Sequence, residues 1–374
     1  MGSTRKYVAQ AYNYPQTSKS SMNDTSQLSA SSKKLKSNQN LSQGELTDCI
    51  QEITKESVSL IDKKDFLKSL AKKGETEEEF EVFVREFRKL SIDPELGDIT
   101  NRAIDLCGTG GDRAHSFNIS TFVSFLVASA GVPVIKHGNR SVSSKCGSAD
   151  LIEAIGIPIN PTKEKIREGL KELGYCFLFA PHFHPSFKHI GPVRKELAKE
   201  SIITIFNLLG PTINPAKPAY QLLGVFDEFH MQKIGNSLSA NGVRSGLVVH
   251  GLVSNEEVRG VDELTNCGDN RIFGIGEKST SMKETWTPSK WSQNYGSFSD
   301  LTGGSLNENL EIMKKLLSGN APDALLATVL INASTAFWIY GRCQSLEEGI
   351  ELSQSLLTNG TLQRWINKVS DFYK

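Results

Sequence analysis

The chain has 374 residues, enough for one large and one small domain around a sizeable buried core. Its 42 basic and 42 acidic residues cancel, so no overall field favours nucleic acid or an anionic membrane as a partner. The six cysteines form no CxxC pair and no Cys/His knuckle, which indicates reduced thiols and disfavours structural zinc. We find no run of the roughly 18 to 20 apolar residues that a membrane span needs, so we expect a soluble, cytoplasmic protein.

The first 41 residues are rich in Ser, Asn, Gln and Lys, with six basic residues and Asp24 as the one acid. Such a segment buries too little apolar surface to offset its ordering entropy, so we predict a disordered extension over residues 1–41. Its basic, serine-rich character is also typical of an organellar transit peptide. An organelle or plastid is therefore the alternative location.

Two patterns follow along the chain. Residues 42–102 carry apolar side chains at three- and four-residue spacing, as in QGELTDCIQEI at 43–53, and predict three or four amphipathic helices. From residue 103 to 374, apolar runs such as VPVIKHG at 132–138 and SGLVVHG at 245–251 alternate with helical stretches, and the chain is helical again from about 305. This predicts an α/β fold: a small, mostly helical domain and a larger domain whose mainly parallel central sheet is flanked by helices.

A glycine-rich loop, CGTGGD at 107–112, precedes a strongly apolar helix that begins near Ser120 or Thr121. Glycines adopt positive φ easily and let a ligand approach the backbone, and free amides at a helix N-terminus bind anions, best of all phosphate. The loop is neither GxxxxGK[ST] nor GxGxxG, because position 113 is Arg. A plain turn is the alternative interpretation.

Three further clusters carry chemistry. KHGNRSVSSKCGSAD at 136–150 combines cations, hydroxyls and an amide, a composition suited to a polyanion, with a solvated basic loop as the alternative. GVDEL at 260–264 contains adjacent carboxylates that an extended backbone directs to opposite faces, so they hold two magnesium ions, or one ion and a positioning contact, unless they form an exposed acidic turn. Arg194 in HIGPVRKEL is a fork for a substrate carboxylate or part of a surface ion pair. His182 and His184 lack a third ligand, which favours packing over metal binding.

These clusters, in this order, resemble the anthranilate phosphoribosyltransferase family of tryptophan biosynthesis. The matching strings are GTGGD, FNIST, KHGNRSVSSKCGSAD, GPVRKEL, IFNLLGPTINPA, VVHG and GVDEL. The resemblance implies transfer of the phosphoribosyl group of 5-phosphoribosyl-1-diphosphate (PRPP) to the amine of anthranilate, with Mg²⁺. It also implies a homodimer and a discontinuous helical domain, 42–102 joined by part of about 170–215.

The resemblance also assigns residues. Those that resemble the PRPP site are Gly108, Gly111, Asp112, Ser116, Asn118, Ile119, Ser120, Thr121, Lys136, His137, Gly138, Asn139, Arg140, Ser141, Val142, Ser143, Ser144 and Ser148. Gly108, Asn139 and Arg194 resemble anthranilate contacts, and Ser120, Asp262 and Glu263 resemble the magnesium site. No side chain stands out as an obligatory acid or base. Two rival functions are a nucleoside phosphorylase of related fold and a non-catalytic relative that binds nucleic acid.

Overall fold

Eight strands form one mixed sheet in the computed structural model, which describes residues 26–112, 114–140, 145–253, 258, 260–279, 284–291 and 295–374. The parallel strands are β1 (Ile104–Gly108), β2 (Val134–Gly138), β3 (Tyr175–Phe179), β4 (Tyr220–Gly224) and β5 (Ser245–Leu252). β6 (Gly260–Val261) and β7 (Asn270–Gly276) pair antiparallel with β5, and β8 (Glu284–Trp286) pairs antiparallel with β7. The order β3-β2-β1-β4-β5-β7-β8 confirms the predicted α/β fold with a mainly parallel sheet.

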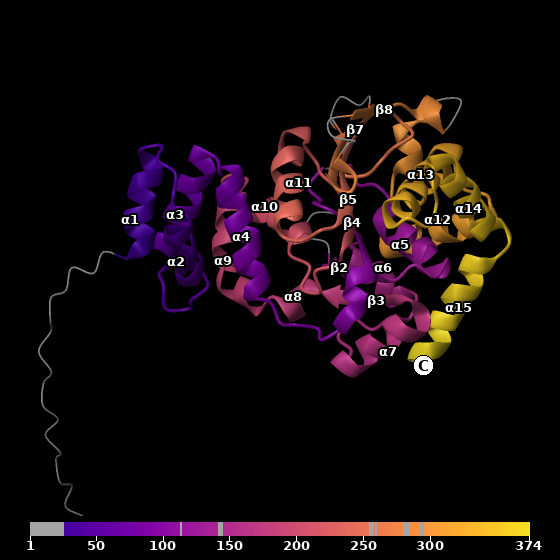
Figure 1. Cartoon of the computed structure of the whole chain (residues 1–374), viewed down its shortest axis with the longest axis horizontal. Coiled ribbons are helices and arrows are strands. Elements are labelled where there is room, and N and C mark those ends of the chain that lie inside the picture. Colours follow the sequence, from indigo (N-terminus) through magenta and orange to yellow (C-terminus); the bar gives the residue numbers. More distant parts are fainter. Residues whose placement is uncertain are drawn as a thin grey trace, which may run out of the picture.

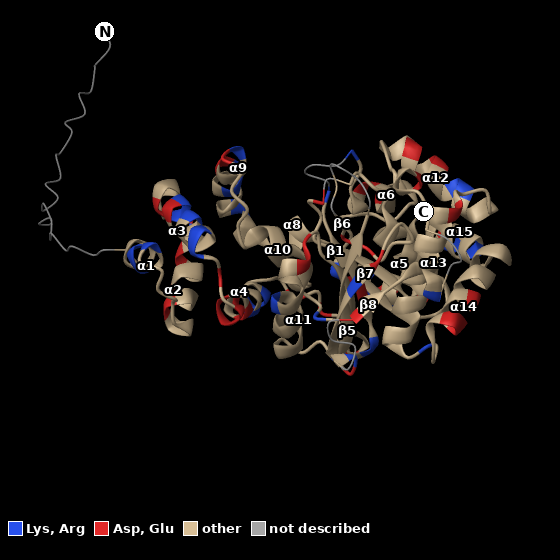
Figure 2. Ribbon diagram, turned by 90° about the horizontal axis from the view of Figure 1, so that it is seen from above, with Lys and Arg blue, Asp and Glu red and all other residues tan. Residues whose placement is uncertain are grey.

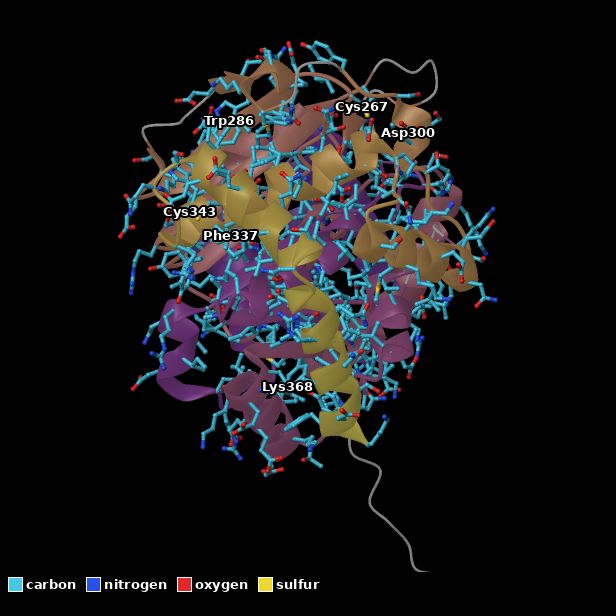
Figure 3. The ribbon with its side chains drawn as sticks, turned by 90° about the vertical axis from the view of Figure 1, so that its right-hand side faces the viewer. Cys267, Trp286, Asp300, Phe337, Cys343 and Lys368 are labelled. Atoms are coloured by element: carbon cyan, nitrogen blue, oxygen red, sulfur yellow. The ribbon has the colours of Figure 1, made fainter. Side chains whose placement is uncertain are left out.

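Alternate strand residues enter two different cores. Leu106, Leu222 and Leu247 face the side covered by helices α5 (Ile119–Ser129), α13 (Asp323–Tyr340), α14 (Leu346–Thr358) and α15 (Thr361–Tyr373). Figure 3 looks onto this side, where Phe337 marks α13 and Lys368 marks α15. The neighbouring strand residues Cys107, Leu223 and Val248 enter the opposite core, which includes α11 (Met231–Ala240). The sheet is therefore covered on both faces, as its nearly continuous apolar strands require.

A layer of helices lies beside the sheet, at the left of Figure 1. It contains α1 (Gln27–Lys36), α2 (Gln43–Ile53), α3 (Leu60–Lys73), α4 (Glu77–Lys89), α9 (Gly191–Lys199) and α10 (Phe206–Leu209), whose apolar side chains share one core. The remaining helices are α6 (Ser148–Ala154), α7 (Lys163–Leu173), α8 (Ala180–Phe183) and α12 (Leu306–Ser318). Basic and acidic residues alternate along the ribbon in both parts (Figure 2), in line with the balanced composition. The division into two domains stays a prediction.

Residues 26–41 are ordered, so the predicted disorder of residues 1–41 was wrong for this part. Ser26 caps α1 by accepting the amide of Ser29, and Leu28 and Leu35 are buried against the neighbouring helices. The amide of Leu41 donates to Glu79 Oε1 at 2.9 Å. Two leucines seven residues apart lie on one helix face, a signal that the polar average composition conceals. Residues 1–25 lie outside the described part of the chain.

One described helix, α13, is long and apolar enough to cross a membrane, contrary to the expectation that the chain contains no such run. However, 72% of it is buried inside the protein, where it packs against α5 and the sheet. A mostly apolar helix without a polar face is expected at the centre of a large core. Its composition therefore reflects packing within this fold.

The last helix, α15, closes over the end of α7. Trp365 Nε1 donates to the carbonyl of Leu173 at 2.8 Å, and Lys368 Nζ donates to the carbonyl of Glu172. These carbonyls belong to the last turn of α7, where helix carbonyls lack internal partners and favour a cation. The C-terminal helix thus satisfies groups that lie far away in the sequence.

Replacing Leu35 by alanine should lower the free energy of unfolding by about 2 to 5 kcal/mol, because it leaves a cavity between α1 and its neighbours. Denaturant titration followed by circular dichroism measures this change. The control Ile203→Ala removes a side chain that is 59% exposed and should change stability by no more than about 0.5 kcal/mol. Equal stability of Leu35→Ala and the unmodified protein would contradict the packed position of α1.

Candidate functional site

The site lies where the strand order reverses direction. β2 and β3 extend the sheet on one side of β1, whereas β4 and β5 extend it on the other. In open α/β sheets a crevice forms at such a point, outside the carboxyl ends of the strands. Gly108 and Gly224 are register partners at the carboxyl ends of β1 and β4.

Asp262 packs directly against these two glycines. A Cβ atom on Gly108 would lie 2.2 Å from Asp262 Oδ2, and one on Gly224 would lie 1.5 Å from the carbonyl oxygen of Asp262. The amide of Gly110, whose φ is +66°, donates to Asp262 Oδ2 at 2.7 Å. The absence of side chains therefore allows the backbone near residue 262 to reach the glycine loop.

Glu263 faces the N-terminus of α5. Its Oε1 accepts the amide of Ser120 at 3.0 Å, one of the amides that a helix leaves unpaired at its start. Lys136 Nζ lies 3.4 Å from Ser120 Oγ and also donates to the carbonyl of Leu106. Ser120, Lys136, Asp262 and Glu263 thus come together from separate segments of the chain, and the two adjacent carboxylates point to different partners.

The charges of this group do not balance. Burial raises the pKa of Asp262 well above its ordinary value, and the nearby charges of Asp112 and Glu263 raise it further. Burial also raises the pKa of Glu263, against the opposing effect of Lys136. We call Asp112, Asp262 and Glu263 the carboxylate cluster. Their mutual repulsion favours the binding of a cation.

The cluster's chemistry fits magnesium held in part by substrate. Within the described residues, no three His, Cys, Asp or Glu side chains are arranged as ligands of one ion. Mg²⁺ does not need such a cage, because it commonly takes one or two carboxylates and completes its shell with water and phosphate oxygens. Asp262, Glu263 and the hydroxyl of Ser120 supply hard oxygen donors of this kind.

The second predicted cluster follows β2. Gly138 lies against Ser148, whose Oγ donates to the carbonyl of Asn139 at 3.1 Å. Arg140 is half exposed and forms ion pairs with Asp150 and, at 2.7 Å, with Glu153. Ser141, Val142, Ser143 and Ser144 lie outside the described residues. The described part of this cluster therefore lies beside β2, with Arg140 bound to acids of α6.

The remaining loop residues connect the two clusters. Asn118 donates to the carbonyl of Cys146 at 3.2 Å and accepts from Asn309 at 3.1 Å, which ties the start of α5 to the second cluster. Gly111 is exposed at the loop, and Ser116 forms an isolated bridge with Thr302. Ile119 and Thr121 have buried side chains and support the helix. The positions of all these residues are consistent with one crevice, and their binding roles stay predictions.

An aromatic wall runs from the site toward the helical layer; it consists of His137, His184, Phe187 and Phe206. Ring centroids are 5.1 Å apart between His137 and His184, 5.7 Å between His184 and Phe187, and 5.5 Å between Phe187 and Phe206. Burial lowers the pKa of His184 to about 4 and that of His137 well below its ordinary value, so both rings are neutral near pH 7.

Arg194 ends this wall. Its guanidinium carbon lies 6.0 Å from the ring centre of Phe187 and 5.7 Å from that of Phe206, and Nη2 lies 3.4 Å from the carbonyl of Phe206. Among the described residues, Arg194 has no carboxylate within ion-pair distance. A partly buried guanidinium without an acid is suited to a planar anion. His182 lies on the exposed side, against Phe183.

Sequence reasoning missed three residues of this region: Gly224, Asp105 and Asn214. Gly224 ends the apolar run YQLLG just as Gly108 ends IDLCG, and this parallel was a usable signal. Asp105 is an acid within an apolar strand, and it accepts from Asn214 at 3.0 Å. Only the fold brings Asn214 to that strand, so the partner of Asp105 had no signal in local spacing.

Gly224→Ala should destabilise the fold by about 1 to 3 kcal/mol, because the new methyl group overlaps the backbone at Asp262. Thermal unfolding measures the loss. Gly191→Ala is the matched control, since a Cβ there meets nothing within 4 Å. Unchanged stability of Gly224→Ala would show that the backbone at Asp262 does not need the space that Gly224 leaves free.

The chain was compared with known proteins. Residues 100–363 match the model of the glycosyl transferase family, a/b domain. The chain is 40% identical to the anthranilate phosphoribosyltransferase of Endomicrobium trichonymphae over 83% of this chain and 87% of that protein. It is also 38% identical to the bifunctional protein TrpGD of Thermotoga maritima over 83% of this chain, and spans 50% of that protein's length.

Solved structures agree in fold. The anthranilate phosphoribosyltransferase (TrpD) from Thermus thermophilus superposes with a TM-score of 0.81 and 33% identity over 92% of this chain and 99% of that one. The enzyme from Saccharomyces cerevisiae in complex with PRPP and Mg gives a TM-score of 0.78 at 22% identity, over 92% and 97% of the two chains, and shows likeness of fold alone. The sequence matches extend over most of the chain at 36 to 40% identity. This chain therefore belongs to the anthranilate phosphoribosyltransferase family.

Proposed function

We propose that this chain transfers the phosphoribosyl group of PRPP to the amine of anthranilate in tryptophan biosynthesis. The products are N-(5-phosphoribosyl)anthranilate and diphosphate. The observation that carries the proposal is the aromatic wall. It starts at His137, the residue after Lys136 on β2, and ends at a guanidinium with no carboxylate within ion-pair distance among the described residues. This arrangement suits an aromatic carboxylate next to a polyanion site.

The donor side of the crevice suits PRPP. The glycine loop, the start of α5 and Lys136 offer amides and a cation at the carboxyl ends of β1 and β2. Asp262, Glu263 and Ser120 would hold Mg²⁺, which supplies positive charge to a departing diphosphate. The Saccharomyces cerevisiae enzyme of the same fold was solved in complex with PRPP and Mg, which supports these two ligands.

The chemistry needs position and charge more than proton transfer. As the bond between ribose C1 and the diphosphate oxygen breaks, Lys136 and the loop amides stabilise the developing negative charge. Arg194 orients the anthranilate carboxylate, and the aromatic wall excludes water from the amine that attacks C1. The neutral rings of His137 and His184 add no positive charge near the ribose as it becomes cationic. No obligatory acid or base is required.

The decisive assay follows the loss of anthranilate fluorescence in the presence of PRPP and Mg²⁺. A nucleoside phosphorylase would instead turn over phosphate and a pyrimidine nucleoside while anthranilate stays inert, and that result would overturn the proposal. Strong, salt-dependent DNA binding in place of turnover would support the nucleic-acid-binding alternative.

Replacing Arg194 by alanine should raise KM for anthranilate by roughly 10- to 100-fold, because a charged hydrogen bond to a carboxylate contributes about 1.5 to 3 kcal/mol. KM for PRPP should stay nearly constant. Arg194→Lys keeps the positive charge but loses the planar guanidinium that binds a carboxylate with two parallel hydrogen bonds. Its KM for anthranilate should therefore lie between the values of the unmodified chain and of Arg194→Ala. Arg167→Ala, an exposed site on α7, serves as the control; a normal KM for anthranilate in Arg194→Ala would remove this assignment.

Replacing Asp262 by asparagine should raise the Mg²⁺ concentration for half-maximal rate by roughly tenfold, because the carboxylate cluster loses a negative charge. Initial rates across a magnesium titration measure the shift. Asp371→Asn, which alters an exposed carboxylate on α15, should leave the titration unchanged. A normal magnesium profile in Asp262→Asn would contradict the metal assignment.

A homodimer is a further proposal that rests on the family resemblance. A cytoplasmic location is a proposal that rests on composition, with an organelle or plastid as the alternative. Leu60 and Ile61, at the start of α3, are 46% and 79% exposed and give the helical layer an apolar surface for a second copy. Light scattering distinguishes a dimer from a chain of 41.1 kDa.

A further inference from the structure

A fully buried carboxylate lies on β1, just before the glycine loop, and takes no part in the chemistry above. Asp105 Oδ2 accepts from Asn214 Nδ2 at 3.0 Å, and its Oδ1 lies 3.4 Å from the amide nitrogen of His137. Asn214 Nδ2 also donates to the carbonyl of Ile135 at 2.9 Å, and Asn214 Oδ1 accepts the amide of Ala216 at 3.0 Å. This pair therefore joins β1, β2 and the segment 210–216 at one buried point.

The segment 210–216, which we call the connecting segment, is held from two further sides. Arg88 of α4 donates through Nε to the carbonyl of Thr212 at 2.9 Å. Gln221 of β4 donates to the carbonyl of Pro211 at 2.7 Å. The connecting segment thus links the helical layer to the strands that carry the site. Its sequence is GPTINPA. This string is part of the family resemblance, but the resemblance assigns no role to any of its residues.

The contact of Asp105 lies at the backbone that follows Lys136. Successive strand residues point to opposite faces, so Lys136 reaches Ser120 on the α5 side while His137 joins the aromatic wall. A hydrogen bond to the peptide between them fixes the direction of both side chains.

We propose that Asp105, held in place by Asn214, is a positioning residue that aims Lys136 at the diphosphate. The proposal rests on the proposed function, because that function gives Lys136 its ligand. It assigns Asp105 no contact with substrate. Its effect passes through the backbone of β2.

Asp105→Asn tests the proposal. The asparagine side chain has one acceptor oxygen where the carboxylate has two, so it cannot accept from both Asn214 Nδ2 and the amide of His137. We therefore expect kcat/KM for PRPP to fall by about tenfold or more. KM for anthranilate should stay within about twofold. Unchanged constants for PRPP would overturn the proposal.

The exchange variant Asp105→Asn with Asn214→Asp separates positioning from mere stability. It returns one carboxylate and one hydrogen bond to the same buried point, so it should regain a several-fold part of the lost kcat/KM for PRPP. A defect of Asp105→Asn that the exchange does not lessen would count against the proposal. Should Asp105→Asn fail to fold, Asn214→Ala carries the test, since it keeps the carboxylate and should raise KM for PRPP by a few-fold.

Lys63→Met is the matched control for a buried charge. Lys63 is buried in the helical layer and donates to the carbonyls of Lys55 and His189. Its loss should lower stability and leave the constants for PRPP unchanged. An equal fall in kcat/KM for PRPP in Lys63→Met would show that instability alone explains the Asp105 defect.

Calorimetric titration with inorganic diphosphate separates this inference from the proposed function. Weaker diphosphate binding by Asp105→Asn than by the unmodified chain supports the positioning role even without turnover. Absent turnover in the unmodified chain would overturn the proposed function alone. Equal diphosphate affinity in both proteins would overturn the positioning role alone.

Discussion

The close packing of Asp262 on Gly108 and Gly224 is the contact on which the site depends. It places a segment that follows β6 over the carboxyl ends of β1 and β4, where the strand order reverses. From that position Asp262 meets the glycine loop and Glu263 meets α5. A side chain at either glycine would separate these groups. The two glycines therefore contribute to function through the space they leave free.

The site has several charges that the protein alone leaves uncompensated. The carboxylate cluster is crowded, Lys136 is buried, and Arg194 has no acid nearby among the described residues. In the function that we propose, a cation would complement the carboxylate cluster, a diphosphate would complement Lys136, and a carboxylate would complement Arg194. The surrounding cores supply the stability that this arrangement costs. Substrate recognition and unfavourable internal electrostatics thus have the same origin.

Much of this architecture could be predicted from the sequence. The same physical reasons explain which elements and contacts could not be predicted. Apolar periodicity identified α2, α4 and the parallel strands, because burial on one face or on both leaves a regular pattern. Helix α1 was missed, since Leu28 and Leu35 are its few apolar residues in a polar segment. Asp262 and Arg194 were found through motifs. The wall from His137 to Arg194, by contrast, joins residues whose proximity only the fold creates.

Asp105 and Asn214 illustrate the remaining limit. Each is a single polar residue with no characteristic spacing, and their partnership spans 109 positions along the chain. The acid inside an apolar strand was visible, because burying a carboxylate requires a partner. The identity of its partner could not be predicted, because Asn214 lies in a segment without regular secondary structure. Pairing of this kind is specified by topology and leaves no local pattern.

The hydrogen bond from Trp365 to the carbonyl of Leu173 joins residues 192 positions apart, and this has a consequence for the order of synthesis. A ribosome makes α7 and β3 long before α15, so the end of α7 and the apolar surface beneath Trp365 stay uncovered until α15 has been made. Early parts of the sheet can form during translation. The surface beside β3 is covered only after α15 has been made and has left the ribosome, so this part of the core is completed later than the rest of the sheet.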